Sequence, residues 1–125
     1  MLPKNIPRMM IDAEATTRNC KKFIFGIALS YGGRQEIIDA IHRIPREQLK
    51  TLTEQEFSSL LWSKEIPDPD LIIRTSGEQR LSNFLPWQST YSELFFSKTY
   101  WPDFSKEEFL EIIEQFSLRQ RRLGK

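Results

Sequence analysis

The chain has 125 residues, a length that suits one small domain. Charged residues make up 28% and hydrophobic residues 39%, and 18 basic against 17 acidic side chains give a formal net charge of +1. This balance excludes attraction to nucleic acid or to an anionic membrane by bulk charge, so an anion site must be a local cluster. The single cysteine, Cys20, excludes an intrachain disulfide, and no apolar run approaches the ~20 residues of a membrane-spanning helix. Both features favour a cytoplasmic protein.

The N-terminal part of the sequence predicts a helix, a strand and a second helix. Pro7 to about Arg18 is predicted to be helical, with proline tolerated in the first turn. Phe23–Leu29 is almost unbroken in apolarity, which is typical of a strand buried on both faces. A turn at Tyr31–Gly33 then leads into a helix from Gly33 to Ile44. The isoleucines expected on its inner side are Ile37, Ile38, Ile41 and Ile44.

A short helix and two short strands are predicted next. Thr53 and Glu56 have the spacing of a capping box, which places the start of a helix at this point. Leu71–Ile73 and Leu94–Phe96 are short apolar runs that predict strands.

The last helix has the clearest start signal. Ser105 and Glu108 have the spacing of a second capping box, and acidic residues gather near the positive end of the helix. Its apolar residues keep helical spacing and are Phe109, Ile112, Ile113, Phe116 and Leu123.

This order of elements predicts an α/β fold with a partial parallel sheet flanked by helices. Parallel sheets are covered on both faces and commonly have more than three strands. A strand as apolar as Phe23–Leu29 belongs in the middle of a sheet, with a strand on either side. The chain supplies few such neighbours, so either it pairs with another chain or half of a domain is missing.

A polar loop follows the second predicted strand. Arg74 stands where that strand ends, and ligands of open α/β sheets bind beyond the carboxyl ends of the strands. Arg80 follows six positions later, and paired arginines can grip phosphate oxygens in bidentate fashion. Ser76, Ser82 and nearby backbone amides can bind the remaining oxygens, while Gly77 allows a sharp turn. The loop therefore predicts an anion site that suits a pyrophosphate.

A surface ion-pair network is the competing interpretation of the same loop. Strand-end arginines commonly pair with nearby acids, and the acids available here are Asp68, Asp70 and Glu78. The loop is also no P-loop, because it lacks the spaced glycines followed by lysine. From the residues alone, the anion site and the surface network both remain open.

Several strings of the sequence match a known family in order. The run Asp70–Gln88, followed by Tyr91–Leu94 and Trp101–Phe104, closely resembles the C-terminal signature of the undecaprenyl diphosphate synthase family of cis-prenyltransferases. Upstream, Ala28–Arg34 is similar to the family's Asn-Tyr-Gly-Gly-Arg turn, and Arg119–Gly124 is similar to its terminal Arg-x-Gly motif. The resemblance covers nearly the whole chain and implies the C-terminal half of a cis-prenyltransferase fold.

The resemblance also implies roles at the matching positions. The residues implied to bind substrate diphosphate are Arg74, Arg80, Leu81, Ser82, Arg122 and Gly124, the last two across a dimer interface. Glu93 is implied to serve a Mg²⁺ ion, directly or through water. Local pairing of Glu93 and interaction of the terminal arginines with the helix dipole are the alternatives.

By this resemblance, residues 1–125 are the C-terminal portion of a single isoprenyl transferase domain. It implies cis-condensation of isopentenyl diphosphate with an allylic diphosphate to give an undecaprenyl-type diphosphate, by a cytoplasmic homodimer peripheral to the inner face of the membrane. The family's essential aspartate stands in an Asp-Gly-Asn-Gly-Arg-Trp motif that this sequence lacks, so no catalytic residue is assigned. We therefore expect the chain to supply the isopentenyl diphosphate site and to be inactive alone. The alternatives are a non-catalytic accessory subunit of a heterodimeric prenyltransferase and an independent phosphate-binding module.

Overall fold

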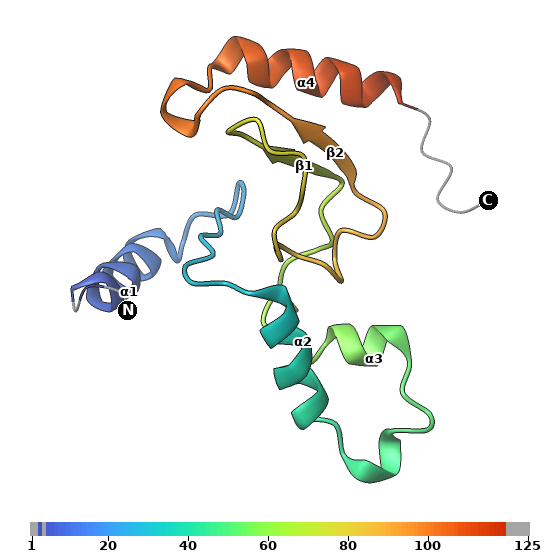
Figure 1. Cartoon of the computed structure of the whole chain (residues 1–125). Coiled ribbons are helices and arrows are strands. Elements are labelled where there is room, and N and C mark those ends of the chain that lie inside the picture. The colour runs from blue at the N-terminus through green and yellow to red at the C-terminus, as the bar shows by residue number, and fades with distance from the viewer. Residues whose placement is uncertain (1–2, 4, 120–125) are drawn as a thin grey trace.

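The computed structural model describes residue 3 and residues 5–119. Its elements in order are α1 (Ile6–Thr17), α2 (Gly33–His42), α3 (Glu54–Ser58), β1 (Leu71–Arg74), β2 (Glu93–Phe96) and α4 (Lys106–Leu118). Short 3-10 turns lie at Arg46–Gln48 and Trp101–Asp103. Figure 1 shows α4 beside the two strands, α2 and α3 together in a second part, and α1 projecting away from both. In the described part of the chain, every helix is too short or too polar to cross a membrane.

The strands β1 and β2 pair in parallel, with Leu71 opposite Glu93 and Arg74 opposite Phe96. This pairing confirms the predicted α/β fold with a partial parallel sheet. Side chains alternate between the faces of a sheet, and residues in register share a face. Arg74 therefore lies on one face, whereas Glu93 lies on the face that α4 covers.

The predicted strand at Phe23–Leu29 is wrong. This segment has no regular structure, and Phe23, Ile24 and Phe25 are 79%, 83% and 79% exposed. A strand needs a partner for its backbone N–H and C=O groups, and the described sheet consists of β1 and β2 alone. The apolar run thus has the composition of a buried strand. In the described part of the chain, however, no strand pairs with it.

A small apolar core lies between α2 and α3. Ala40, Phe57 and Leu61 are buried there, and Ile37, Ile44, Leu52, Leu60 and Trp87 pack partly buried around them. Two of the isoleucines expected on the inner side of α2 behave differently, since Ile38 is 47% and Ile41 is 44% exposed. Half of the predicted inner side therefore faces the core, and the other half has no cover.

The two predicted capping boxes have different outcomes. At α3 the Thr53 hydroxyl accepts from the Glu56 amide at 3.2 Å, and the Glu56 carboxylate accepts from the Thr53 amide at 2.8 Å. At α4 the Ser105 hydroxyl accepts from the Glu108 amide at 3.1 Å, but the Glu108 carboxylate accepts from the Ser97 hydroxyl at 2.5 Å instead. The second box is thus half formed, because a tertiary contact to the end of β2 takes the Glu108 side chain.

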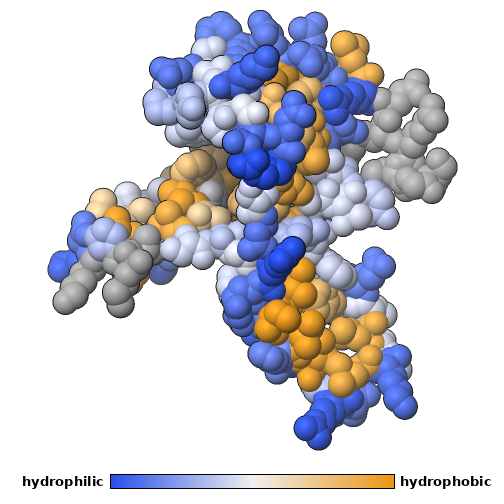
Figure 2. All heavy atoms as spheres, in the orientation of Figure 1, coloured by the Kyte–Doolittle hydropathy of each residue, from blue (hydrophilic) through white to orange (hydrophobic). Residues whose placement is uncertain are grey.

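The chain exposes more surface than a compact protein of its size. Its accessible surface is 10997 Å², whereas a folded monomer of 14.8 kDa has about 7000 Å². Figure 2 shows apolar atoms on the surface of the segment between α1 and α2 and over the part that holds α2 and α3. Many large apolar side chains are therefore exposed, among them Phe23, Ile24 and Phe25.

Candidate functional site

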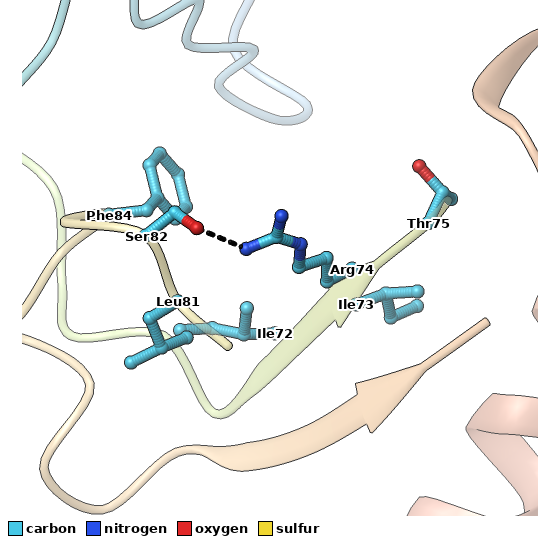
Figure 3. Close-up of a pocket in the computed structure, with 7 residues that line it drawn as sticks. All are labelled: Ile72, Ile73, Arg74, Thr75, Leu81, Ser82 and Phe84. Carbon is cyan, nitrogen blue, oxygen red and sulfur yellow. Dashed lines mark hydrogen bonds between the residues drawn. The ribbon is translucent and has the colours of Figure 1, made fainter. Parts of the chain in front are cut away.

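A surface pocket of about 320 Å³ lies where β1 ends and the following loop folds back over the strand. Its lining residues are Ile72, Ile73, Arg74, Thr75, Leu81, Ser82 and Phe84. In Figure 3 the Arg74 guanidinium points toward Ser82, while Ile72 and Leu81 form an apolar floor beneath. The pocket thus combines one cationic fork with an apolar base.

Arg74 is held in place by the loop that follows it. Its Nη1 donates to Ser82 Oγ at 2.7 Å and to the carbonyl oxygen of Arg80. Because these two bonds use the Nη1 hydrogens, Nε–H and Nη2–H are the donors that a bound anion could take. A guanidinium fixed in this way is preorganised for bidentate contact with phosphate oxygens.

The loop reaches this position through an unusual backbone. Ser82, Asn83 and Leu85 have φ values of 49°, 69° and 48°, in the left-handed region. Each such residue costs about 1–2 kcal/mol, so the surrounding structure must hold the turn in place. The start of α2 does so, because the Gly33 amide donates to the Asn83 carbonyl at 2.9 Å and the Arg34 amide donates to Asn83 Oδ1 at 2.8 Å.

Arg80 does not line the pocket. Its guanidinium pairs with the Glu78 carboxylate, and the two side chains are 62% and 45% exposed. The surface-network interpretation is therefore the observed arrangement for Arg80. An exposed pair of this kind contributes about 0–1 kcal/mol, so a doubly charged ligand could displace Glu78 at small cost.

The backbone amides of the loop are already used within the chain. The Ser76 amide donates to the Thr99 carbonyl and the Gly77 amide donates to the Ser97 carbonyl, both at 2.8 Å. These two amides are therefore not the phosphate donors that the sequence suggested. Gly77 does turn the chain sharply, as predicted, with a φ of 78°.

A buried polar cluster behind the loop was not predicted from the sequence. Glu36 of α2 is 0% exposed, and its carboxylate accepts from Tyr31 Oη at 2.5 Å and from Gln88 Nε2 at 3.0 Å. It also accepts from the backbone amide and the hydroxyl of Ser63, at 3.0 and 3.1 Å. The sequence did carry one signal, because Glu36 stands one helical turn before Ala40 on the buried stripe of α2.

Hydrogen bonds keep the Glu36 carboxylate charged. Burial by itself raises the pKa of Glu36, but the hydrogen bonds from Tyr31, Gln88 and Ser63 outweigh it and hold the pKa below its ordinary value of 4.5. Burial, followed by the bond to Glu36, raises the pKa of Tyr31, so its hydroxyl stays protonated as a donor. The cluster is therefore an anionic acceptor surrounded by neutral donors.

Glu93 does not lie at the pocket. Glu93 begins β2 on the face opposite to Arg74, and its carboxylate accepts from Arg119 Nη1 at 2.5 Å. The Arg119 guanidinium also lies 4.0 Å from the centre of the Phe95 ring. Local pairing, the alternative to a metal role for Glu93, is thus the observed arrangement.

The described residues offer little to a metal ion by themselves. Between residues 5 and 119, no three His, Cys, Asp or Glu side chains gather into a cluster that could hold one. A single carboxylate such as Glu93 fits Mg²⁺ only where water and substrate phosphates complete the coordination. Arg122 and Gly124, which the resemblance assigns to diphosphate binding, lie outside the described residues.

Comparison with known proteins identifies the family. A family described as putative undecaprenyl diphosphate synthase matches residues 1–124. The chain belongs to this family. The resemblance seen in the strings from Ala28 to Gly124 is thereby confirmed, and this prenyltransferase family includes isoprenyl transferases.

Prenyltransferases from several organisms are similar along the whole chain. It is 47% identical to a tritrans,polycis-undecaprenyl-diphosphate synthase (geranylgeranyl-diphosphate specific) from Thermoplasma volcanium, over 100% of this chain and 51% of the relative. It is 48% identical to an isoprenyl transferase from Thermotoga maritima, over 98% of this chain and 54% of that protein. The chain therefore spans about half the length of these prenyltransferases.

Solved prenyltransferase structures share the backbone arrangement. A probable undecaprenyl diphosphate synthase from Campylobacter jejuni has a TM-score of 0.84 at 37% identity, covering 99% of this chain and 58% of that chain. Lavandulyl diphosphate synthase from Lavandula x intermedia, in complex with dimethylallyl diphosphate, has a TM-score of 0.91 at 32% identity, covering 99% and 56%. The chain thus has the fold of about half of a prenyltransferase.

Proposed function

We propose that this chain is the isopentenyl diphosphate-binding part of an isoprenyl transferase that lengthens an allylic diphosphate by cis-condensation. The pocket at the end of β1 carries the proposal. Isopentenyl diphosphate joins a diphosphate to a short apolar chain, and the pocket joins the Arg74 guanidinium to a floor of Ile72 and Leu81. Arg80 supplies a second cation once the diphosphate takes it from Glu78.

In the proposed reaction the C–O bond of the allylic diphosphate breaks, and its electron pair leaves with the pyrophosphate. The double bond of isopentenyl diphosphate supplies the electrons of the new C–C bond, and loss of a proton from the isopentenyl unit restores a double bond. Magnesium, when bound, stabilises the charge on the departing pyrophosphate. Arg74 and Ser82 fix the diphosphate of the isopentenyl unit, and this positioning of the double bond against the allylic carbon lowers the barrier.

The proposal includes a homodimer. Glu93 and Arg74 lie on opposite faces of the same sheet, so in this structure one chain does not direct both side chains at one diphosphate. A second copy could bring its Glu93, after release from Arg119, to the Mg²⁺ that serves the first copy's substrate. Arg122 and Gly124 are proposed to reach the diphosphate across the same interface.

The proposal also requires more polypeptide than this chain. Isopentenyl diphosphate is one of two substrates, and no described residue is assigned to the allylic one. A complementary half is supported by the uncovered apolar run Phe23–Leu29 and by the span of half a prenyltransferase. We therefore propose that the chain alone is inactive, and that the assembled enzyme works in the cytoplasm beside the membrane that receives its lipid product.

A reconstitution experiment tests this function. The chain is co-expressed with the part of the Thermotoga maritima isoprenyl transferase that it does not match, and labelled isopentenyl diphosphate is supplied with farnesyl or geranylgeranyl diphosphate. We expect polyprenyl diphosphate from the assembled protein and none from the 125-residue chain alone. Arg74→Ala should abolish product, whereas Arg46→Ala, an exposed arginine of a 3-10 turn, should not.

The other outcomes distinguish the alternatives. A pull-down that finds no catalytic prenyltransferase partner counts against the accessory subunit. The formed contact between Arg74 and Ser82 argues against that role, because a subunit without substrate need not keep it. Pyrophosphate binding that survives loss of both Arg74 and Arg80 would exclude this loop as the site.

A further inference from the structure

The start of α2 makes direct contact with the loop that follows β1. The amides of Gly33 and Arg34 both donate to Asn83, one to its carbonyl and one to its side chain. A Cβ atom added to Gly33 would lie 2.0 Å from Pro86 Cδ, so the loop packs directly on the helix backbone. The left-handed residues of the loop are therefore held from one side by α2.

Behind the contact between α2 and the loop, Glu36 joins three separate segments. It binds Tyr31 before α2, Ser63 after α3, and Gln88 at the end of the loop. The Tyr31 ring also packs edge-on against Phe84, with centroids 5.7 Å apart and an interplanar angle of 78°. Because Phe84 lines the pocket, Glu36 reaches the pocket through Tyr31, while Gln88 ties Glu36 to the end of the same loop.

The negative charge of Glu36 is what these contacts require. Its two oxygens accept from two hydroxyls, a backbone amide and a side-chain amide. A glutamine at this position would place an NH₂ group, itself a donor, opposite at least one of those donors. Loss of a buried bond of this kind removes a restraint from the strained turn of the loop.

We propose that Glu36 is a positioning residue for the isopentenyl diphosphate site. It holds Tyr31 and Gln88 so that the left-handed turn presents the Ser82 hydroxyl to Arg74. The inference rests on the proposed function for the identity of the substrate. Its claim about the geometry of the loop is independent of that function.

The first test measures the loop itself. Glu36→Gln and Leu61→Val are compared in the assembled protein, because Leu61 is buried in the apolar core between α2 and α3, is 2% exposed and has no part in the polar cluster. Hydrogen exchange of the Gly33, Arg34 and Phe84 amides, which donate to Asn83 and to the Leu81 carbonyl, should become faster by about tenfold or more in Glu36→Gln and stay unchanged in Leu61→Val. Unchanged exchange in Glu36→Gln overturns the inference, whether or not the protein binds isopentenyl diphosphate.

The second test separates positioning from general stability. We expect Glu36→Gln to raise the KM for isopentenyl diphosphate by about tenfold to a hundredfold and to leave the KM of the allylic diphosphate within about twofold. Glu36→Asp, which keeps the charge, should recover part of the loss. Equal rises in both KM values, or the same rise in Leu61→Val, would show that Glu36 acts on stability alone. A wild type that binds no isopentenyl diphosphate refutes the proposed function, and the exchange test then decides the inference by itself.

Discussion

Both Nη1 hydrogens of Arg74 are used inside the chain, one on Ser82 and one on the Arg80 carbonyl. The guanidinium is therefore ordered before any ligand arrives, and little side-chain entropy remains to be lost on binding. Arg80 differs, because it is exposed and paired with Glu78. At the scale of single residues, the proposed diphosphate site has one fixed cation, Arg74, whereas Arg80 would have to leave Glu78 before it could join the site.

Arg74→Lys tests whether the arginine fork matters or only its charge. Lysine keeps the charge but cannot bond Ser82, a backbone carbonyl and a phosphate in the same plane. We expect the Kd of the assembled protein for isopentenyl diphosphate to rise about tenfold, measured by calorimetry. Arg46→Lys, on an exposed turn, is the control and should leave the Kd unchanged. An unchanged Kd in Arg74→Lys would mean that charge alone suffices.

Glu36 gives the protein a predictable response to acid. Burial raises its pKa, but the hydrogen bonds outweigh burial, so the folded-state pKa lies below the ordinary 4.5. The stability contributed by Glu36 is therefore fully present above about pH 4.5 and is lost as the pH falls through the depressed pKa. Urea unfolding of the assembled wild type and Glu36→Gln between about pH 7 and about pH 3 should show their stability difference shrinking in acid. A difference that stays constant with pH would contradict a charged Glu36.

At the scale of elements, α2 serves as the support of the loop. Its first turn carries Gly33, the backbone donors to Asn83, and Glu36. The loop is also tied to α3, because Trp87 Nε1 donates to Ser58 Oγ at 3.0 Å and its ring lies 4.6 Å from that of Phe57. The short sheet thus supplies Arg74, and the helices fix the loop that faces it.

Gly33→Ala tests this support directly. The new Cβ would stand 2.0 Å from Pro86 Cδ, so either the helix or the loop must move. We expect a loss of about 1–3 kcal/mol in the free energy of unfolding, together with weaker binding of isopentenyl diphosphate. Gln35→Ala, two residues along the same turn and exposed, should change neither. If Gly33→Ala kept the full free energy of unfolding and full binding of isopentenyl diphosphate, the loop would not depend on close packing against α2.

At the scale of the whole molecule, the chain is a partial fold. The pair β1–β2 is covered by α4 on one face, and the α2–α3 core is small. The segment Phe23–Leu29 has neither a strand neighbour nor a cover, although its composition is that of a central strand. These features are explained together if a second polypeptide segment completes the sheet.

Ile24→Ser tests this completion. Ile24 is 83% exposed, so the change should leave the isolated chain as stable as before. We expect its affinity for the complementary half to fall about tenfold or more, because an apolar side chain would be lost from the new interface. Leu118→Ser, at a 78% exposed residue of α4, is the matched control and should assemble normally. Binding titrations followed by tryptophan fluorescence measure both affinities.

The sequence by itself determined the local features of this protein. Helix starts at Thr53 and Ser105, the short strands, the turn at Gly77 and the family were all readable, because caps, apolar runs, glycines and motif strings depend on residues close together in the chain. It also identified Arg74 and Ser82, which the pocket brings together.

Only the tertiary structure decided which of these residues act together. Residues far apart in sequence meet through packing, and no local pattern records that Glu36 joins Ser63 to Gln88, or that Glu93 and Arg74 lie on opposite faces. The strand expected at Phe23–Leu29 failed for the same physical reason. An apolar run reports that a segment is suited to burial, whereas a strand exists only when a neighbour pairs with its backbone.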